Sequence, residues 1–397
     1  MFRGGSVCVQ CRRGSDQGAL AASGERDRRR ARYRLCDSRE SAAPCRPRAR
    51  SSVLILRPVE KRDLHDLIAL ARQLDSMNLP GDPEFLERQI HASMASLRLG
   101  AADLRPGRAD HVYVFMLEDS EAGRCVGSSQ ILAKHGSPQS PHYWLEVSAE
   151  ERHSRELGRR FVHTKLRLRS SEDGPTEIGG LILDPAYRRH PGKWGKALSI
   201  VRFAYMSAHP ERFEREVIAE MLSPFEAPGQ NLLWDAFGAR FTGLTFREAD
   251  HLSARSKRFI ADLFPRDPVY VSLFPEPVQA MIGTPGETAK AAVRILERVG
   301  FRYLNQVDPF DGGPYYGAAR DAISSVRDRR ELVLPCMPEE GGTEMEGPLA
   351  LLSAEAALGF RATVVPLSPN GAPVVSRECR EALGVKAGDR VAVTPLP

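Results

Sequence analysis

The chain has 397 residues, of which 42% are hydrophobic and 27% are charged, and its formal net charge is +5. This length predicts two or three domains, and the composition is that of a globular protein with enough apolar residues to bury a core. No apolar run reaches the ~18 residues that a membrane-spanning helix needs. The seven cysteines are too sparse for a disulfide scaffold.

Positive charge is concentrated in the first fifty residues, which hold 13 arginines, no lysine and 5 acidic residues. Their net charge is +8, so the rest of the chain carries −3 and gives no electrostatic reason to expect a nucleic-acid partner. The stretch lacks apolar periodicity and cannot bury enough surface to fold alone. We therefore predict a disordered, arginine-rich extension over residues 1–52.

Three interpretations of this extension stay open: a nucleic-acid-binding arm, a zinc site, or a segment upstream of a misassigned start. A zinc site would use the C-x2-C…C-x8-C pattern, although its second spacing exceeds the usual two to about four residues; the cysteines are Cys8, Cys11, Cys36 and Cys45. The third interpretation depends on Val53, which opens a regular domain start and whose codon can initiate translation. The segment has neither the apolar core of a secretory signal nor the acid-poor composition of a transit peptide.

Beyond Val53, apolar spacing predicts alternating strands and helices. The predicted strands cover residues 54–56, 111–117, 125–133, 176–184, 217–222 and 301–307. The predicted helices cover 57–75, a segment that starts at Asp82-Pro83, a segment that ends near His209, a short piece at 232–237, and 290–299. A Gly-, Pro- and Glu-rich linker at 335–348 precedes about 40 residues of alternating pattern. We expect an α+β fold with a mostly antiparallel central sheet, a main domain over 53–330, and a linker with a small β-rich unit over 331–397.

The most informative local motif lies at a predicted strand-to-helix turn. Leu181, Ile182 and Leu183 end the strand, and a basic, Gly-containing loop follows with Arg188, Arg189, Gly192, Gly195 and Lys196. Backbone N–H groups and a helix N-terminus at such a turn can bind an anion, and a pyrophosphate suits the site. An ordinary loop before a surface helix is the competing interpretation.

The loop resembles the coenzyme A loop of the GNAT acyltransferase superfamily, Gln/Arg-x-x-Gly-x-Gly/Ala. Trp194 stands where the second small residue is expected, and Gly195 comes one place late. From Leu54 to Arg327 the chain resembles the arginine N-succinyltransferase family. The segments that carry this resemblance occur in order, at 56–59, 114–120, 154–157, 183–185, 217–221, 259–263, 268–271, 300–303 and 310–314. The most distinctive of them is Phe310-Asp311-Gly312-Gly313-Pro314.

The resemblance implies a GNAT-like fold and transfer of a succinyl group from succinyl-CoA to the α-amine of arginine, in arginine catabolism. It implies succinyl-CoA, or another acyl-CoA, as co-substrate, with no permanently bound cofactor. It also implies a cytoplasmic enzyme that acts on small molecules, has no nucleic-acid or membrane partner, and is a possible homo- or hetero-oligomer. The strand position that holds succinyl-CoA in the family falls on Leu181, whose backbone would serve.

One position departs from the family in a way that affects the chemistry. Gly286 stands where the family has its proton-donating histidine, so that role does not carry over to this chain. Glu287 and Glu220 are weak catalytic candidates, and Glu220 and Asp311 are candidates for contact with the substrate. Glu287 is equally a helix-start charge, and Asp311 equally closes a turn. We expect no metal.

Four functions stay open at this point. The leading one is an acyl-CoA-dependent N-acyltransferase close to arginine N-succinyltransferase. The second keeps the fold but uses another amine or acyl donor. The third is a non-catalytic subunit that binds coenzyme A or pairs with an active relative, which the glycine at position 286 suggests. The fourth, a nucleic-acid binder, depends on residues 1–50 alone.

Overall fold

The computed structural model describes residues 53–73, 81–100, 111–224, 230–253, 256–335 and 347–397, all within the compact unit Arg50–Pro397. The arginine-rich extension, its cysteine pattern and most of the predicted 335–348 linker lie outside the described residues. The division of the chain into domains stays a prediction.

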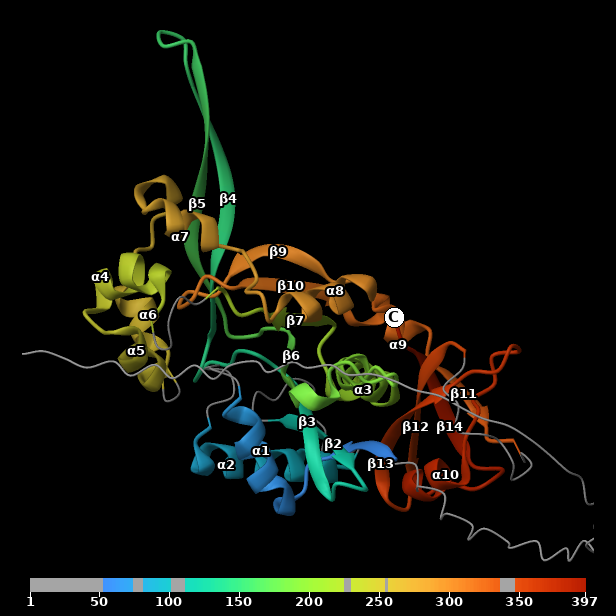
Figure 1. Ribbon diagram of the computed structural model, residues 1–397. Helices are drawn as coiled ribbons and strands as arrows, with labels where there is room; N and C mark the ends of the chain where they lie inside the picture. Colours follow the sequence, from blue (N-terminus) through green and yellow to red (C-terminus); the bar gives the residue numbers. More distant parts are fainter. Residues whose placement is uncertain (1–52, 74–80, 101–110, 225–229, 254–255, 336–346) are drawn as a thin grey trace, which may run out of the picture. The chain divides into compact units, whose positions relative to one another are not determined.

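The described strands join into one sheet (Figure 1). In chain order they are β1 Leu54–Pro58, β2 Val112–Asp119, β3 Arg124–Leu132, β4 His142–Ser154, β5 Arg159–Ser171, β6 Thr176–Leu183, β7 Glu216–Glu220, β8 Val269–Tyr270, β9 Arg302–Val307, β10 Pro314–Ala319, β11 Arg330–Val333, β12 Leu349–Ala356, β13 Gly359–Pro366 and β14 Arg390–Pro395. Their order across the sheet is β11-β14-β12-β13-β1-β2-β3-β6-β7-β10-β9-β4-β5-β8. Among these strands only β6 and β7 pair in parallel, which confirms the predicted α+β class with a mostly antiparallel sheet.

The helices of the described segments are α1 Leu64–Ala71, α2 Pro83–Arg98, α3 Trp194–Ala208, α4 Ala239–Thr242, α5 Phe246–Ser253, α6 Arg258–Leu263, α7 Glu276–Met281, α8 Lys290–Arg298, α9 Ser324–Arg327 and α10 Arg377–Leu383. Helices α1 and α2 pack on one face of β2 and β3, and α3 packs on the other. Helices α4 to α7 form a separate core with β4 and β5. No helix of the described segments has the length and apolar character needed to cross a membrane.

Burial on both faces explains the near-continuous apolar run of β2. Tyr113, Phe115 and Leu117 face the core around α3, whereas Val114 and Met116 face α1 and α2. Tertiary packing on two sides favours such runs over strict alternation. The predicted strand at 111–117 and its hairpin partner at 125–133 are therefore both confirmed, within a residue or two at each end.

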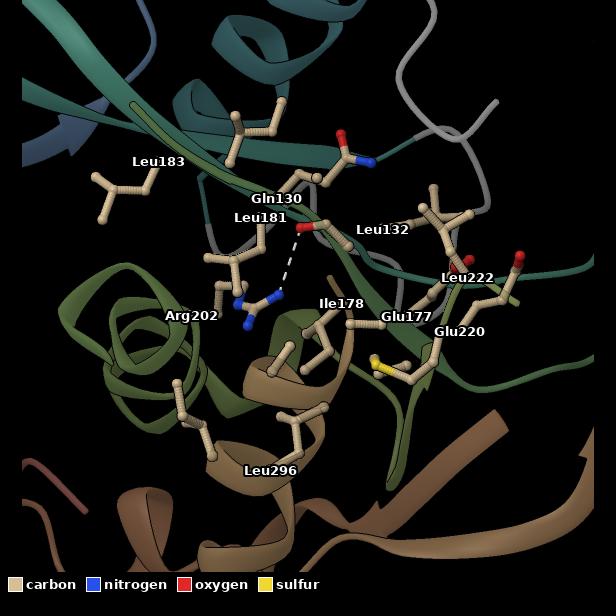
Figure 2. A pocket seen from close by; sticks show the side chains of 18 of the residues that line it. Gln130, Leu132, Glu177, Ile178, Leu181, Leu183, Arg202, Glu220, Leu222 and Leu296 are labelled. Carbon is tan, nitrogen blue, oxygen red and sulfur yellow. Dashed lines mark hydrogen bonds between the residues drawn. The ribbon is translucent and has the colours of Figure 1, made fainter. Parts of the chain in front are cut away.

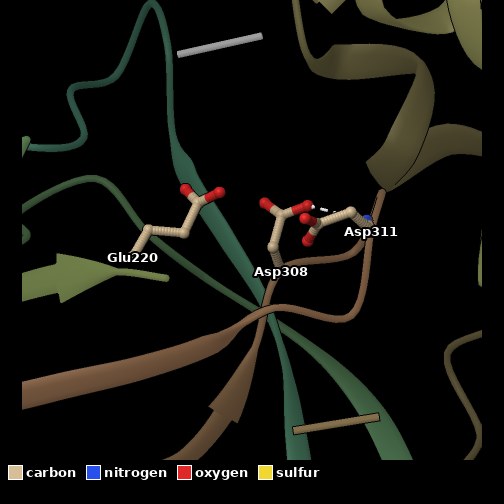
Figure 3. A group of neighbouring side chains, drawn as sticks. All are labelled: Glu220, Asp308 and Asp311. Carbon is tan, nitrogen blue, oxygen red and sulfur yellow. Dashed lines mark hydrogen bonds between the residues drawn. The ribbon is translucent and has the colours of Figure 1, made fainter. Parts of the chain in front are cut away.

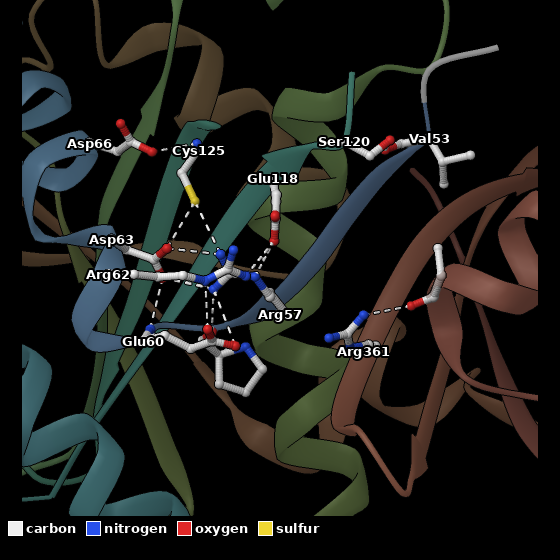
Figure 4. A network of polar contacts seen from close by, with 12 residues as sticks. Val53, Arg57, Glu60, Arg62, Asp63, Asp66, Glu118, Ser120, Cys125 and Arg361 are labelled. Atoms are coloured by element: carbon white, nitrogen blue, oxygen red, sulfur yellow. Dashed lines mark hydrogen bonds and ion pairs between the residues drawn. The ribbon is translucent and has the colours of Figure 1, made fainter. Parts of the chain in front are cut away.

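A buried ion pair fixes the start of the fold (Figure 4). The Arg57 guanidinium donates to both carboxylate oxygens of Asp63, at 2.7 and 2.8 Å, and also contacts Glu118 on β2. Arg57 and Pro58 remain in β1, so the helix begins at Leu64 and not at residue 57 as the sequence suggested. Cys125 of β3 is buried against this pair.

The long hairpin of β4 and β5 was not predicted. Only the residues near its base are buried, Leu145 and Leu166 among them, and most residues from Glu150 to His163 are exposed. Apolar alternation is present only at the base, at Tyr143, Leu145 and Val147 and again at Leu166 and Leu168, and the exposed outer part has none. Figure 1 shows the hairpin running past the rest of the sheet as a two-stranded ribbon.

Candidate functional site

The site forms where β6 and β7 diverge. These two strands pair only at Thr176–Val217 and Glu177–Ile218, and beyond those rungs they separate. A cavity of about 1370 Å³ lies along the separation, lined by β6, the end of β7, and helices α2, α3 and α8 (Figure 2). It is large enough for an extended ligand, since ligand pockets are typically about 300–1,000 Å³.

A bulge in β6 shapes the middle of the cleft. Ser128 of β3 pairs with Ile182 and Gln130 pairs with Gly179, so β6 carries one extra residue between these two rungs. Gly180 takes φ of 55°, a left-handed value that favours glycine, and a Cβ there would lie 2.8 Å from the Gln130 side chain. A bulge leaves its extra residue outside the hydrogen-bonded ladder. The backbone around Leu181 is therefore turned toward the cleft.

One end of the cleft is basic, and we call it the basic end. It contains the predicted loop and the first turn of α3, with the lining cations Arg188, Arg189, Lys193 and Lys196. Burial lowers the pKa of Lys196, and the neighbouring Lys193 lowers it further. Such a concentration of cations at a helix N-terminus favours an anionic group.

Trp194, which departs from the family's loop pattern, has a structural role here. Its indole N–H donates to Nδ1 of His190 at 3.0 Å, and the Gly192 N–H donates to the same nitrogen at 3.1 Å. A Cβ on Gly192 would lie 2.8 Å from the Trp194 ring, so the tryptophan packs under the loop and the glycine permits it. Gly192 does not itself line the cavity, whereas Gly195 does.

The opposite end is acidic, and we call it the acidic end. Carboxylate oxygens of Glu220, Asp308 and Asp311 lie within 4.8 Å of one another (Figure 3). Glu220 ends β7 and lines the cavity, whereas the two aspartates lie in the β9–β10 loop and are 6% and 1% exposed. Asp311 accepts from the N–H groups of Ser223 and Gly313, and Asp308 accepts from Phe310 and Asp311. The aspartates thus build the turn, and Glu220 presents its carboxyl group to the cleft.

Like charges in a buried position make these acids hard to ionise. Burial raises the pKa of Glu220 well above its ordinary value, and Asp308 and Asp311 raise it further. Burial, with Asp308 next, raises the pKa of Asp311 to about 7. The Tyr315 hydroxyl lies 3.2 Å from Glu220 and 3.4 Å from Asp308. The cluster is therefore poised to hold protons or to be neutralised by a cationic ligand.

Three carboxylates at this spacing could hold a metal ion, but several of their oxygens already have hydrogen-bond donors. Both oxygens of Asp311 and one of Asp308 already accept backbone N–H groups. Lys257, which lines the cavity, lowers the pKa of Asp308 and of Glu220, against the larger effect of burial. A lysine beside the acids would compete with a hard cation for the remaining oxygens.

A histidine–glutamate pair lies beside the acidic end. His135 and Glu177 both line the cavity, and Nδ1 of His135 contacts the Glu177 carboxylate. Burial raises the pKa of Glu177. The combined charge interaction and hydrogen bond with His135 lower it by more, so the pKa of Glu177 lies below its ordinary value. The His135 ring stacks on His142 with centroids 4.1 Å apart. Burial lowers the pKa of His142 to about 2, with His135 and Lys257 as smaller causes, so His142 is neutral.

The remaining predicted residues lie near the cleft but differ in orientation. The Gly286 N–H donates to the Leu222 carbonyl at 2.8 Å, and a Cβ on Gly286 would lie 2.8 Å from the Ser223 carbonyl oxygen. No side chain fits there without movement of the backbone. Glu287 is 86% exposed, pairs with Lys290 and does not line the cavity. Its catalytic role stays a prediction, and its surroundings are those of a helix-start charge.

Sequence reasoning missed His135, Glu177, Asp308, Lys257 and Arg202 as residues of the cleft. Glu177 lies four residues before Leu181 in the predicted strand, so its position on the strand was available as a signal. The other four lie in separate segments of the chain that only the tertiary fold brings to the cleft. Of the predicted residues, those of the basic end and Glu220 line one cavity, with Asp311 directly behind Glu220; the lining residues are Leu181, Ile182, Leu183, Arg188, Arg189, Gly195, Lys196 and Glu220.

Comparison with known proteins gives one consistent result. The family model described as arginine N-succinyltransferase beta subunit matches residues 54–325. A protein of Citrobacter koseri named arginine N-succinyltransferase is 33% identical over 349 residues, which covers 87% of this chain and 98% of that protein. A protein of the same name from Yersinia pseudotuberculosis is 34% identical over 348 residues, covering 86% and 97%.

A solved structure shares the fold. It is titled the structure of arginine/ornithine succinyltransferase subunit AI from Pseudomonas aeruginosa. Its TM-score to this chain is 0.73 at 29% sequence identity, and the match covers 87% of this chain and all of that one. The resemblance drawn from sequence segments therefore extends to the whole described fold.

Proposed function

The chain belongs to the arginine N-succinyltransferase family, and we propose that it transfers the succinyl group of succinyl-CoA to the α-amine of L-arginine. The observation that carries the proposal is one cleft with opposite charges at its two ends. An acyl-CoA is anionic at its phosphates, and arginine carries a cationic guanidinium. Each end of the cleft therefore matches one of the two substrates.

The donor enters along β6. Arg188, Arg189 and Lys196, with the N-terminal turn of α3, are placed to hold the pyrophosphate. The pantetheine arm then follows the separation between β6 and β7, and the thioester reaches the bulge near Leu181. A backbone N–H there would stabilise the oxyanion that forms when the amine attacks.

The acceptor is held at the acidic end. Glu220 faces the cavity with two aspartates behind it, so a guanidinium would meet a carboxylate in a largely desolvated setting. A cation at this position relieves the repulsion that raises the pKa values of the cluster. Planar guanidinium groups suit carboxylates because they donate two parallel N–H bonds.

His135 is our candidate for proton transfer in place of the family histidine. Its Nδ1 is engaged by Glu177, which leaves Nε2 to accept a proton from the attacking amine. The C–N bond forms first and gives the tetrahedral oxyanion, and the C–S bond breaks as this intermediate collapses. Of the two protons that the α-ammonium loses, one goes to the departing thiolate to give free coenzyme A, and the other leaves to solvent.

A thiol-release assay with the full-length chain tests this function. Succinyl-CoA and acetyl-CoA are each combined with arginine, ornithine or lysine, and free coenzyme A is followed. We expect release that needs both succinyl-CoA and arginine. Release with another pair keeps the fold and the chemistry but changes the substrate. Absence of release with every pair, together with measurable coenzyme A binding, supports a non-catalytic subunit instead.

The non-catalytic subunit is retained as the second candidate because Gly286 lacks the family's proton donor. The solved relative is titled a subunit, so assembly with copies of this chain or with a related chain belongs to the same proposal. We also propose, as the family resemblance implies, a cytoplasmic location and no partner among nucleic acids or membranes.

A further inference from the structure

Arg202 lines the cleft from the middle of α3, although it is only 3% exposed. Its three hydrogen bonds all go to uncharged groups. Nε donates to the Ser199 carbonyl at 3.1 Å, Nη2 donates to the Ser199 hydroxyl at 2.9 Å, and Nη1 donates to the Gly179 carbonyl at 3.4 Å. No carboxylate among the described residues forms an ion pair with it.

A buried guanidinium without an anionic partner is costly, because desolvation is not offset by a counter-charge. Burial lowers the pKa of Arg202 to about 9. Of the five N–H donors of a guanidinium, three are used by described residues, so within that part of the chain one remains on each terminal nitrogen. Two such donors are what bidentate recognition of a carboxylate requires.

The other lining cations have acidic neighbours or lie toward the start of α3, and Arg88, which is exposed, lies 3.9 Å from Glu84. Lys134 forms ion pairs with Asp173 and Glu214. Lys257 interacts with the acidic end, where its charge lowers the pKa of Asp308. The cations of the basic end lie before α3 or in its first turn, and the nearest of them along the helix, Lys196, is six residues from Arg202, about 9 Å at 1.5 Å per residue. Within the described part of the chain, Arg202 is thus the lining cation that is buried and lacks an acidic neighbour.

Its position also fits the length of the acyl chain. Figure 2 shows the Arg202 side chain reaching from α3 to β6, with its hydrogen bond to Gly179 drawn as a dashed line. Gly179 lies two residues before Leu181, roughly 6–7 Å along a strand. A succinyl group spans about 4 Å between its two end carbons, and a hydrogen bond adds about 3 Å.

We propose that Arg202 binds the free carboxylate of the succinyl group and so selects succinyl-CoA over acyl-CoAs with uncharged chains. The inference extends the proposed function, because it assigns the donor specificity of the same cleft. The carboxylate supplies the counter-charge that the buried guanidinium lacks. An uncharged chain of equal length would leave the guanidinium buried and unpaired.

Binding measurements on the full-length chain test the proposal without the amine. Titration calorimetry with succinyl-CoA, butyryl-CoA and coenzyme A should give a Kd for succinyl-CoA at least about tenfold lower than for butyryl-CoA. Arg202→Gln should weaken succinyl-CoA binding by about 30-fold or more and leave butyryl-CoA and coenzyme A nearly unchanged. Arg202→Lys keeps the charge but loses the planar guanidinium. Its Kd for succinyl-CoA should lie between the Kd of the wild type and that of Arg202→Gln.

Arg212→Gln is the matched control, because Arg212 also donates to backbone carbonyls, those of Ser96 and Leu99, but does not line the cavity. Arg212→Gln should leave the ratio of the Kd for succinyl-CoA to the Kd for butyryl-CoA unchanged. Equal affinity of the wild type for succinyl-CoA and butyryl-CoA overturns the proposal even if every variant fails to fold. Equal weakening of all three ligands by Arg202→Gln overturns it as well and indicates a purely structural arginine. Because arginine is absent, failure of the transfer reaction does not affect the outcome.

Discussion

The two ends of the cleft differ in how the chain builds them. The basic end comes from a single run of sequence, residues 188–196, at a strand-to-helix turn. The acidic end combines the last residue of β7 with a loop more than eighty residues later, and the adjacent pair adds residues from the β3–β4 loop and β6. The basic end is also largely exposed to water, whereas the acidic end is buried.

The two ends should therefore differ in how well they tolerate substitutions. Exposed charges are screened by water and salt, so each contributes little and neighbours can substitute for it. Buried charges interact strongly and depend on exact partners. Substitutions at the acidic end should therefore be severe and specific to the amine, and those at the basic end mild and specific to the donor.

The largest effect is expected for His135→Gln. Loss of a positioned general base typically lowers a rate by about 10²- to 10⁴-fold. We expect kcat to fall in that range while the Kd for coenzyme A stays unchanged, as measured by thiol release and by titration.

Glu287→Gln serves as the control for His135→Gln, because Glu287 is exposed and does not line the cavity. It should leave kcat within about twofold. An unchanged kcat in His135→Gln would show that proton transfer goes through another group or through water, and it would remove the catalytic function from this end.

A smaller loss is expected for Glu220→Gln, and it should come with a gain in stability. Removing a buried carboxylate that faces a cationic substrate should lower kcat/KM for arginine by about 30- to 1,000-fold. The same change relieves repulsion with Asp308 and Asp311, so thermal unfolding at pH 8 should require a higher temperature than in the wild type.

The sign of this stability effect follows from the raised pKa values. An acid whose folded pKa lies above its unfolded value stabilises the fold at low pH, and that contribution is lost as the pH rises through the folded pKa. For Asp311 this stability is lost between pH 3.8 and about pH 7. The gain in thermal stability of Glu220→Gln over the wild type should thus be small at pH 5 and largest at pH 8. A Glu220→Gln variant that is less stable than the wild type at pH 8 would contradict this prediction.

His142→Phe should remove a pH dependence of the opposite sign. The folded pKa of His142 is lowered from 6.5 to about 2, so its neutral form contributes stability above pH 6.5 that is lost as the pH falls. Between pH 6.5 and 5 this amounts to at most about 2 kcal/mol. Denaturant unfolding at these two pH values should show the loss in wild type and little of it in the variant.

The comparison for His142→Phe is made in the Glu220→Gln background, where the opposing titration of the acidic end is weakened. An identical slope in both proteins would mean that His142 is protonated in the folded state or that its site is hydrated.

The smallest effect is expected at the basic end. Arg189→Gln removes one exposed cation of a cluster, so coenzyme A binding should weaken by less than about tenfold. The loss should shrink further at high salt, and KM for arginine should not change. Titration of both proteins with coenzyme A at 50 and 500 mM salt measures this effect. A larger loss of affinity that does not depend on salt would mean that Arg189 makes a buried contact, and the two ends would then not differ in the way described.

Much of the fold followed from local patterns. The Asp82-Pro83 signal did start a helix, and the Asp82 carboxylate accepts the Phe85 N–H at 2.7 Å, as an N-cap does. The strands at 111–117 and 176–184 were located because their apolar and β-branched residues are buried. The β4–β5 hairpin was missed because burial imposes an apolar pattern only on its base, at Tyr143, Leu145 and Leu166, and that short signal was overlooked beside the exposed outer part.

The sequence by itself determined the family, the α+β class, and the basic loop, because each depends on residues that are neighbours along the chain. Only the tertiary structure decided that Glu220 meets Asp308 and Asp311, and that His135 meets Glu177. It also decided that Arg202 reaches the cleft with no acidic partner among the residues that the structure describes. Charge interactions depend on distance and burial, and neither is encoded in sequence separation. The acidic end and the buried arginine could therefore be recognised only after the strands had been placed side by side.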